Sequence, residues 1–203
     1  MPAATRKWTA EEVRNLSSDS RRWPRYELID GELLVTPAPR NVHQFVITQL
    51  LRLLAEYVDD QRLGLALTAP ADLELELGTV TQPDIFVVPY GSLRDGKPWH
   101  DWSQVARLLL AVEVISPGSV RHDRVTKRKY FQRVGVPDYW VVDADERTFE
   151  RWRPEDREAT VFRGEMTWFP ALATMPFELD VAAFFNDVFA RLERVAGWAE
   201  PKS

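Results

Sequence analysis

Two short apolar segments of the sequence each carry a single carboxylate, and this pair constrains the fold more than any other feature. Asp84 opens the apolar run at 85–88, and Glu113 stands inside a second run at 108–115. Both runs have the length and composition of buried strands, where an unpaired charge costs roughly several kcal/mol. A bound cation would remove that cost. The sequence therefore predicts two strands whose acids share a metal ion.

The composition limits which metal such a site can hold. The chain has 203 residues and no cysteine, which excludes disulfides, zinc–thiolate sites and thiol nucleophiles. Its histidines, His43, His100 and His122, show no metal-ligand spacing. The ligands are therefore expected to be oxygens, which favours magnesium, manganese or calcium.

Length and hydropathy predict one domain over 1–203, with a core at about 9–185 and a C-terminal helix to about 199. Hydrophobic residues make up 45% of the chain, enough for a substantial core. The sequence shows no apolar leader and no apolar stretch of about 18 residues. We therefore expect a cytoplasmic protein that does not enter a membrane.

One segment is strongly basic although the net charge of the chain is −5. Between 121 and 133 a single acid, Asp123, stands among six basic residues: Arg121, Arg124, Lys127, Arg128, Lys129 and Arg133. Such a segment can present a positive patch to a polyanion such as a nucleic acid. The alternative is a helix face that is simply solvated.

Local patterns predict the main elements. Thr9 and Glu12 form a capping box for a short helix, and Asp30-Gly31 is typical of a hairpin turn between two strands. Further expected elements are helices at 43–57, 123–134 (capped by Asp123) and 181–196, strands at 72–77 and 139–143, and a hairpin of 148–153 with 159–163. The acids of 72–77 are interpreted as a solvated sheet face rather than a metal cluster.

The hairpin register brings two acids to one face. Ile29 is expected opposite Glu32, and Glu27 opposite Leu34, so these four side chains share a face. Glu32 is the predicted site acid, and Glu27 is the candidate if Glu32 lies elsewhere.

A lysine on the basic helix is the expected cation beside Glu113. Helical spacing groups Lys127 with Tyr130, Phe131 and Val134 on the packed side, and it places Lys129 on the polar side. In the alternative interpretation, Lys127 extends its ammonium to water.

These residues, taken in order, resemble a known family. They are 26–32 (YELIDGE), 82–84 (QPD), 112–117 (VEVISP), Asp123 with Lys127, and 135–143 (GVPDYWVVD). The pattern resembles the PD-(D/E)XK nuclease superfamily and is similar to its Uma-type bacterial restriction endonuclease family. The resemblance implies a restriction-endonuclease-like α/β (α+β) fold, with a mixed central β-sheet flanked by helices.

The resemblance also implies roles for individual residues. Asp84 and Glu113 would be the metal ligands, and Glu32 would be a further acid of the site. The superfamily's lysine usually follows the strand acid by two residues, where this chain has Ile115. Lys127 would take its place from the following helix.

The leading hypothesis is a magnesium-dependent endonuclease that cleaves DNA, with manganese as a possible substitute. Asp84, Glu113 and a backbone carbonyl near Val114 would hold the metal, and Lys127 would orient the attacking water. Two arginines, Arg124 and Arg128, would contact neighbouring phosphates. By analogy with enzymes that cut both strands of a duplex, a homodimer is expected.

Two other function classes fit parts of the sequence. A non-catalytic binding or assembly protein on a nuclease scaffold could use Trp99 and Trp102 as exposed contacts. A glycosidase could use the two strand carboxylates if they flank a cleft for a sugar, but the adjoining basic helix favours a phosphate.

Overall fold

The computed structural model describes residues 6–19, 24–36, 38–94, 96–97 and 101–197, and its centre is a six-stranded mixed sheet. The strand order is β3-β4-β5-β6-β7-β8, and the β5–β6 pair alone is parallel. The strands are β3 (Gly64–Thr68), β4 (Ile85–Pro89), β5 (Leu110–Val114), β6 (Asp138–Asp143), β7 (Thr148–Trp152) and β8 (Thr160–Phe162). The sheet confirms the predicted mixed α/β architecture.

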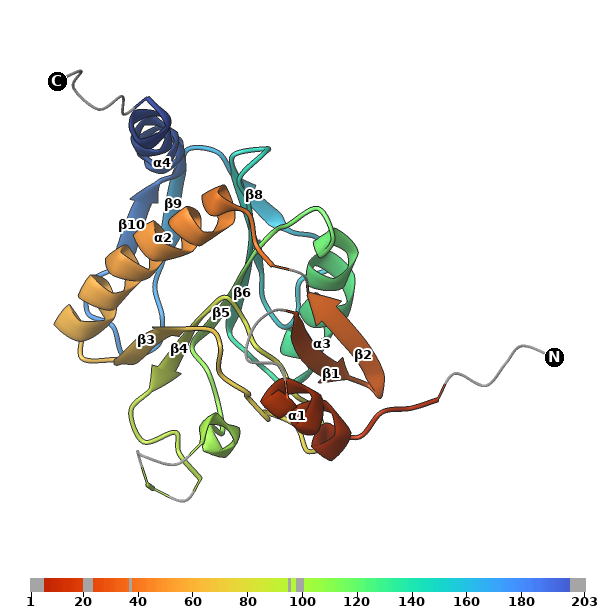
Figure 1. Cartoon of the computed structure of the whole chain (residues 1–203). Coiled ribbons are helices and arrows are strands. Elements are labelled where there is room, and N and C mark those ends of the chain that lie inside the picture. The colour runs from red at the N-terminus through yellow and green to blue at the C-terminus, as the bar shows by residue number, and fades with distance from the viewer. Residues whose placement is uncertain (1–5, 20–23, 37, 95, 98–100, 198–203) are drawn as a thin grey trace, which may run out of the picture.

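Apolar side chains leave the central strands on both faces, so the sheet has two separate cores. One core lies under α2 (Asn41–Asp60), α4 (Val181–Ala196) and the hairpin of β9 (Glu165–Trp168) with β10 (Phe177–Asp180). The other lies under α3 (Arg128–Arg133) and the hairpin of β1 (Arg25–Ile29) with β2 (Glu32–Thr36). Figure 1 shows α2 and α4 on one side of the sheet and α3 with β1 and β2 on the other.

Several local predictions are confirmed. Helix α1 (Ala10–Asp19) begins at the predicted capping box, in which the Thr9 amide donates to the Glu12 carboxylate at 2.9 Å. In the β1–β2 hairpin Ile29 pairs with Glu32 and Glu27 pairs with Leu34, as expected. Helix α4 spans the predicted residues.

The segment 72–77 is not the predicted strand. Only Leu73 forms a β-bridge there, with Thr81, and the side chain of Leu77 is 95% exposed. Alternation of leucines with acids predicted a half-buried strand, but among the described residues no strand pairs with the end of this segment. Strands β3, β9 and β10 were not among the predicted elements.

The basic helix begins earlier than predicted and contains an irregular turn. Helical structure starts at Val120, and the π-helical segment η2 (His122–Lys127) leads directly into α3. Asp123 is therefore inside the helix rather than at its N-cap. A short 3-10 helix, η1 (Trp102–Gln104), precedes β5. None of the helices within the described ranges is both long and apolar enough to cross a lipid bilayer.

Candidate active site

The two predicted strand acids lie side by side because of the register between β4 and β5. Ile85 pairs with Val112 in antiparallel fashion, which places Asp84 opposite Glu113 at the start of β4. Both residues are 2% exposed. The amide of Val114 donates to Asp84 Oδ2 at 2.9 Å, so the Asp84 carboxylate is fixed against the neighbouring strand.

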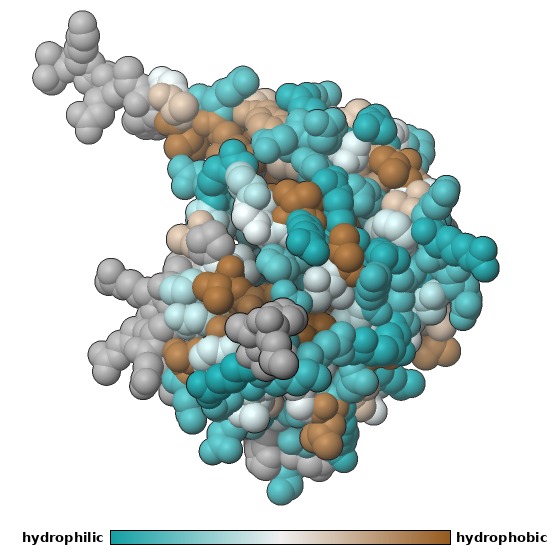
Figure 2. Space-filling view, turned by 90° about the vertical axis from the view of Figure 1, so that its right-hand side faces the viewer, coloured by the Kyte–Doolittle hydropathy of each residue, from teal (hydrophilic) through white to brown (hydrophobic). Residues whose placement is uncertain are grey.

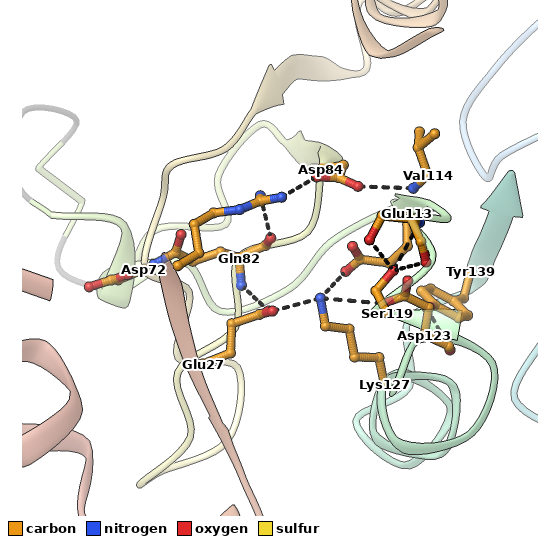
Figure 3. A network of polar contacts seen from close by, with 12 residues as sticks. Glu27, Asp72, Gln82, Asp84, Glu113, Val114, Ser119, Asp123, Lys127 and Tyr139 are labelled. Carbon is orange, nitrogen blue, oxygen red and sulfur yellow. Dashed lines mark hydrogen bonds and ion pairs between the residues drawn. The ribbon is translucent and has the colours of Figure 1, made fainter. Parts of the chain in front are cut away.

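Lys127 reaches this pair from the helix on the same face of the sheet. Its Nζ lies 2.9 Å from Glu113 Oε1 and 2.7 Å from Glu27 Oε2 (Figure 3). Tyr130 and Phe131 are fully buried on the same helix side, while Lys129 is exposed. The structure therefore places Lys127 inward, as the helical spacing predicted.

The hairpin contributes Glu27 rather than Glu32 to the cluster. Glu32 is exposed beside the turn, and within the described residues no hydrogen bond or ion pair joins it to Asp84, Glu113 or Lys127. Glu27 is 2% exposed, and it also accepts a hydrogen bond from the amide of Gln82 at 2.7 Å. The pairing register was predicted correctly, but Glu27 is buried against Lys127 while Glu32 is exposed next to the turn, so we replace Glu32 by Glu27 in the site.

Two further residues that sequence reasoning did not assign hold Asp84. Arg25 Nη2 lies 2.7 Å from Asp84 Oδ1, and His43 Nε2 lies 3.1 Å from Asp84 Oδ2. Arg25 and Glu27 stand two residues apart on β1, so they project from the same face. The sequence signal for His43 is its position among the apolar residues that α2 buries.

Asp123 is a fourth buried carboxylate of the cluster, not the helix cap that was expected. It is 2% exposed, and its Oδ1 lies 3.7 Å from Lys127 Nζ. The hydroxyl of Tyr139 donates to the Asp123 carbonyl at 2.9 Å, which ties the π-helical turn to β6. Such turns often occur at functional sites, where they redirect side chains.

Burial and neighbouring charges shift the pKa values of these groups in opposite directions. Burial raises the pKa of Glu113 well above its usual value, and Lys127 offsets only part of this effect. Burial also raises the pKa of Asp123, to about 6. Burial would raise the pKa of Asp84 as well, but the hydrogen bond from His43 and the charge of Arg25 hold it below its usual range.

The surrounding carboxylates also keep Lys127 charged. Burial alone would lower the pKa of Lys127, but Glu113, Glu27 and Asp123 together raise it above its usual value. Lys127 is therefore a permanent cation in this site.

The arginines expected to contact phosphates are partly engaged within the protein. Arg124 forms ion pairs with Asp143 at 3.0 Å and with Glu150 at 2.6 Å. Arg128 stacks over the ring of Trp152 and hydrogen-bonds Gln132 at 3.0 Å. Their contact with a nucleic acid stays a prediction.

The aromatic contacts suggested for a partner protein receive little support. Trp102 is half-buried and packs edge-to-face on Phe86, and Trp99 lies outside the described residues. The side of the molecule seen in Figure 2 is largely hydrophilic, with its apolar residues in small separate groups. This side therefore offers no broad apolar surface for a partner.

Comparison with solved structures identifies the class of fold. A protein described as "a putative nuclease belonging to DUF820", from Anabaena variabilis, superimposes with a TM-score of 0.69 at 22% sequence identity, covering 89% of this chain and 99% of that one. The two chains therefore share the same mixed α/β fold over nearly their whole lengths. No curated protein matched the sequence.

The family follows from the sequence match. Residues 10–182 match the Uma2 family, which is described as "Putative restriction endonuclease", and the chain belongs to this family. The predicted family resemblance is confirmed.

Proposed function

We propose that this protein is a metal-dependent nuclease that hydrolyses DNA phosphodiester bonds. The observation that carries the proposal is the set of four buried carboxylates, Glu27, Asp84, Glu113 and Asp123, gathered around one buried lysine. Burying so many acids is costly unless their charge serves a purpose that requires it. Binding a divalent cation is such a purpose, and the family match supports it.

The charge of the cluster fits a divalent metal ion. Four carboxylates face two permanent cations, Lys127 and Arg25, so two negative charges remain when all four acids are ionised. A cavity of ≈ 10 Å³ lined by Asp84, Glu113 and Asp123 has room for about one water-sized particle.

The number of protein ligands favours magnesium or manganese. Within the described part of the chain, no group of three or more acids or histidines is placed so that all of them could hold one metal ion. Magnesium commonly uses one or two carboxylates and keeps several waters. Asp84 and Glu113 would therefore hold the ion, and water and substrate oxygens would complete its shell.

The side chains of the site have separable tasks in this mechanism. A bound metal would polarise the phosphate and lower the pKa of a coordinated water. Glu27 and Glu113 hold the Lys127 ammonium in place, where it can orient the attacking water or stabilise charge on the phosphate. Arg25 and His43 keep Asp84 ionised.

Cleavage and metal binding together test the proposal. Wild type, Asp84→Asn and Glu113→Gln should be compared on plasmid DNA, single-stranded DNA and RNA with magnesium or manganese, alongside calorimetric metal titration. Glu32→Gln is the matched control, because Glu32 is exposed outside the cluster. We expect both site variants to lose metal binding and cleavage, while Glu32→Gln retains both.

The opposite results also have clear meanings. Metal binding by Asp84→Asn equal to that of wild type would place the metal elsewhere. Failure of wild type to cut any nucleic acid with either metal would favour the non-catalytic binding protein.

A further inference from the structure

A second, larger cavity adjoins the acidic cluster. Its volume is ≈ 370 Å³, within the range of small-ligand sites. Arg25, His43 and Asp84 line both cavities, so the larger one begins where the acidic cluster ends. A group bound in the larger cavity would therefore be attached to, or adjacent to, whatever occupies the acidic site.

The walls of this cavity combine apolar surfaces with a polar edge. Its apolar lining residues are Pro39, Ile47, Leu51 and Ala69, and its polar ones are Gln44, Thr48 and Thr68. The hydroxyls of Thr48 and Thr68 donate to backbone carbonyls at 2.9 and 2.7 Å, which leaves their oxygens able to accept. A planar ring with polar edges, such as a nucleobase, matches this lining.

His43 links the two cavities and supplies an independent sign of a ligand. Its side chain is 6% exposed, and its Nε2 contacts Asp84. Its Nδ1 is buried without a hydrogen-bond partner among the described residues. Buried ring nitrogens are normally paired, so the ring that lines the cavity has unused hydrogen-bonding capacity.

The charges around the site do not favour binding of duplex DNA through many contacts with its phosphates. Three nearby cations, Arg25, Arg124 and Lys127, are already paired with carboxylates, and the chain as a unit is acidic. Binding by many phosphate contacts requires cations that are available to the nucleic acid. Affinity at this cavity must therefore come in large part from contacts other than these three cations.

We propose that the larger cavity receives one unpaired base of the DNA substrate, next to the phosphate that is cut. This inference rests on the proposed nuclease function and specifies its substrate as single-stranded or locally unpaired DNA. A base in an intact duplex would have to leave its stack first, which costs binding energy.

Binding measurements can isolate the contribution of the base. The probes are a fluorescent single-stranded oligodeoxynucleotide, the blunt duplex made from it, and an abasic strand with the same number of phosphates, all measured with calcium in place of magnesium. We expect wild type to bind the base-bearing strand about tenfold or more tightly than either other probe.

Filling the cavity should remove this preference. Ile47→Trp adds a ring inside the cavity, and Thr48→Phe fills it from an exposed position that is safe for folding. Glu56→Trp, at an exposed position of the same helix, is the matched control. We expect Ile47→Trp and Thr48→Phe to bind all three probes alike, while Glu56→Trp behaves as wild type.

The outcomes separate this inference from the nuclease assignment. Wild type that binds the abasic strand or the duplex as tightly as the base-bearing strand overturns the base site. An unchanged preference in folded Thr48→Phe overturns it as well. A preference for the base-bearing strand that both cavity variants lose supports the base site, even if no probe is cut with magnesium or manganese. Absence of cleavage would contradict only the proposed nuclease function.

Discussion

Replacing Lys127 by methionine should destabilise the protein strongly. The lysine is 4% exposed, and its ammonium contacts three carboxylates that are each 2% exposed: Glu27, Glu113 and Asp123. Methionine keeps most of the side-chain volume but removes the charge. Breaking a buried ion pair costs about 3–5 kcal/mol, and here several acids lose their cation together. We expect the free energy of unfolding to fall by about 4 kcal/mol near neutral pH.

The cost of this substitution should depend on pH. Burial already raises the pKa of Glu113 and Asp123, and loss of Lys127 would raise both further. An acid with a raised pKa in the folded state stabilises the fold while it is protonated, and this contribution is lost as the pH rises through that pKa. Lys127→Met should therefore cost less near pH 5 than near pH 7.

Urea unfolding followed by tryptophan fluorescence and circular dichroism measures these effects. Lys129→Met is the matched control, because Lys129 is exposed two residues away and should tolerate the change. The double variant Lys127→Met with Glu113→Gln should recover more than about 1 kcal/mol, because one acid no longer needs the cation. A loss in Lys127→Met that equals that in Lys129→Met would refute the buried ion cluster. Activity assays of Lys127 variants must accordingly be made on protein shown to be folded.

Three further predictions concern stability. Asp123→Asn should stabilise the protein by roughly 2–3 kcal/mol near pH 7.5 and by little near pH 4. The reason is that the wild-type carboxyl has a pKa of about 6 and ionises unfavourably above it. A difference in urea midpoint between the variant and wild type that does not change with pH would contradict this. Gly64→Ala should cost about 1–3 kcal/mol or more in thermal unfolding, since its Cβ would lie 1.9 Å from the Val88 carbonyl oxygen, and a wild-type melting temperature would contradict the β3–β4 pairing. Leu77→Ser should change the free energy of unfolding by no more than about 0.5 kcal/mol, because the leucine is 95% exposed. A large loss would support the original prediction that 72–77 is a half-buried strand.

The sequence predicted those parts of the site that depend on local patterns. Asp84 and Glu113 could be found because each is a charge in an apolar strand. Lys127 could be found because Tyr130 and Phe131 fix the buried side of its helix. The first inference uses the composition of a short apolar run, and the second uses the 3.6-residue period of a helix; both are local properties of the chain.

The remaining parts depend on contacts between distant segments. Arg25 and His43 reach Asp84 from positions 59 and 41 residues away in the chain. Choosing Glu27 over Glu32 required knowing which of the two acids the docked helix brings next to Lys127. The π-helical turn that places Asp123 inside the cluster has no local signal that distinguishes it from an ordinary helix start.

Because the lysine stands on a helix rather than on β5, the cluster around it assembles only when folding is complete. On a single strand, an acid and a lysine two residues apart would be neighbours in any partly folded chain. Here Lys127 meets Glu113 only after the helix has packed its aromatic side chains on the sheet, and it meets Glu27 only after the hairpin has also docked. A partly folded or damaged copy of the chain would therefore lack the assembled cluster of Lys127 and its carboxylates. Under the proposed nuclease function, cleavage would therefore be confined to molecules that are fully folded.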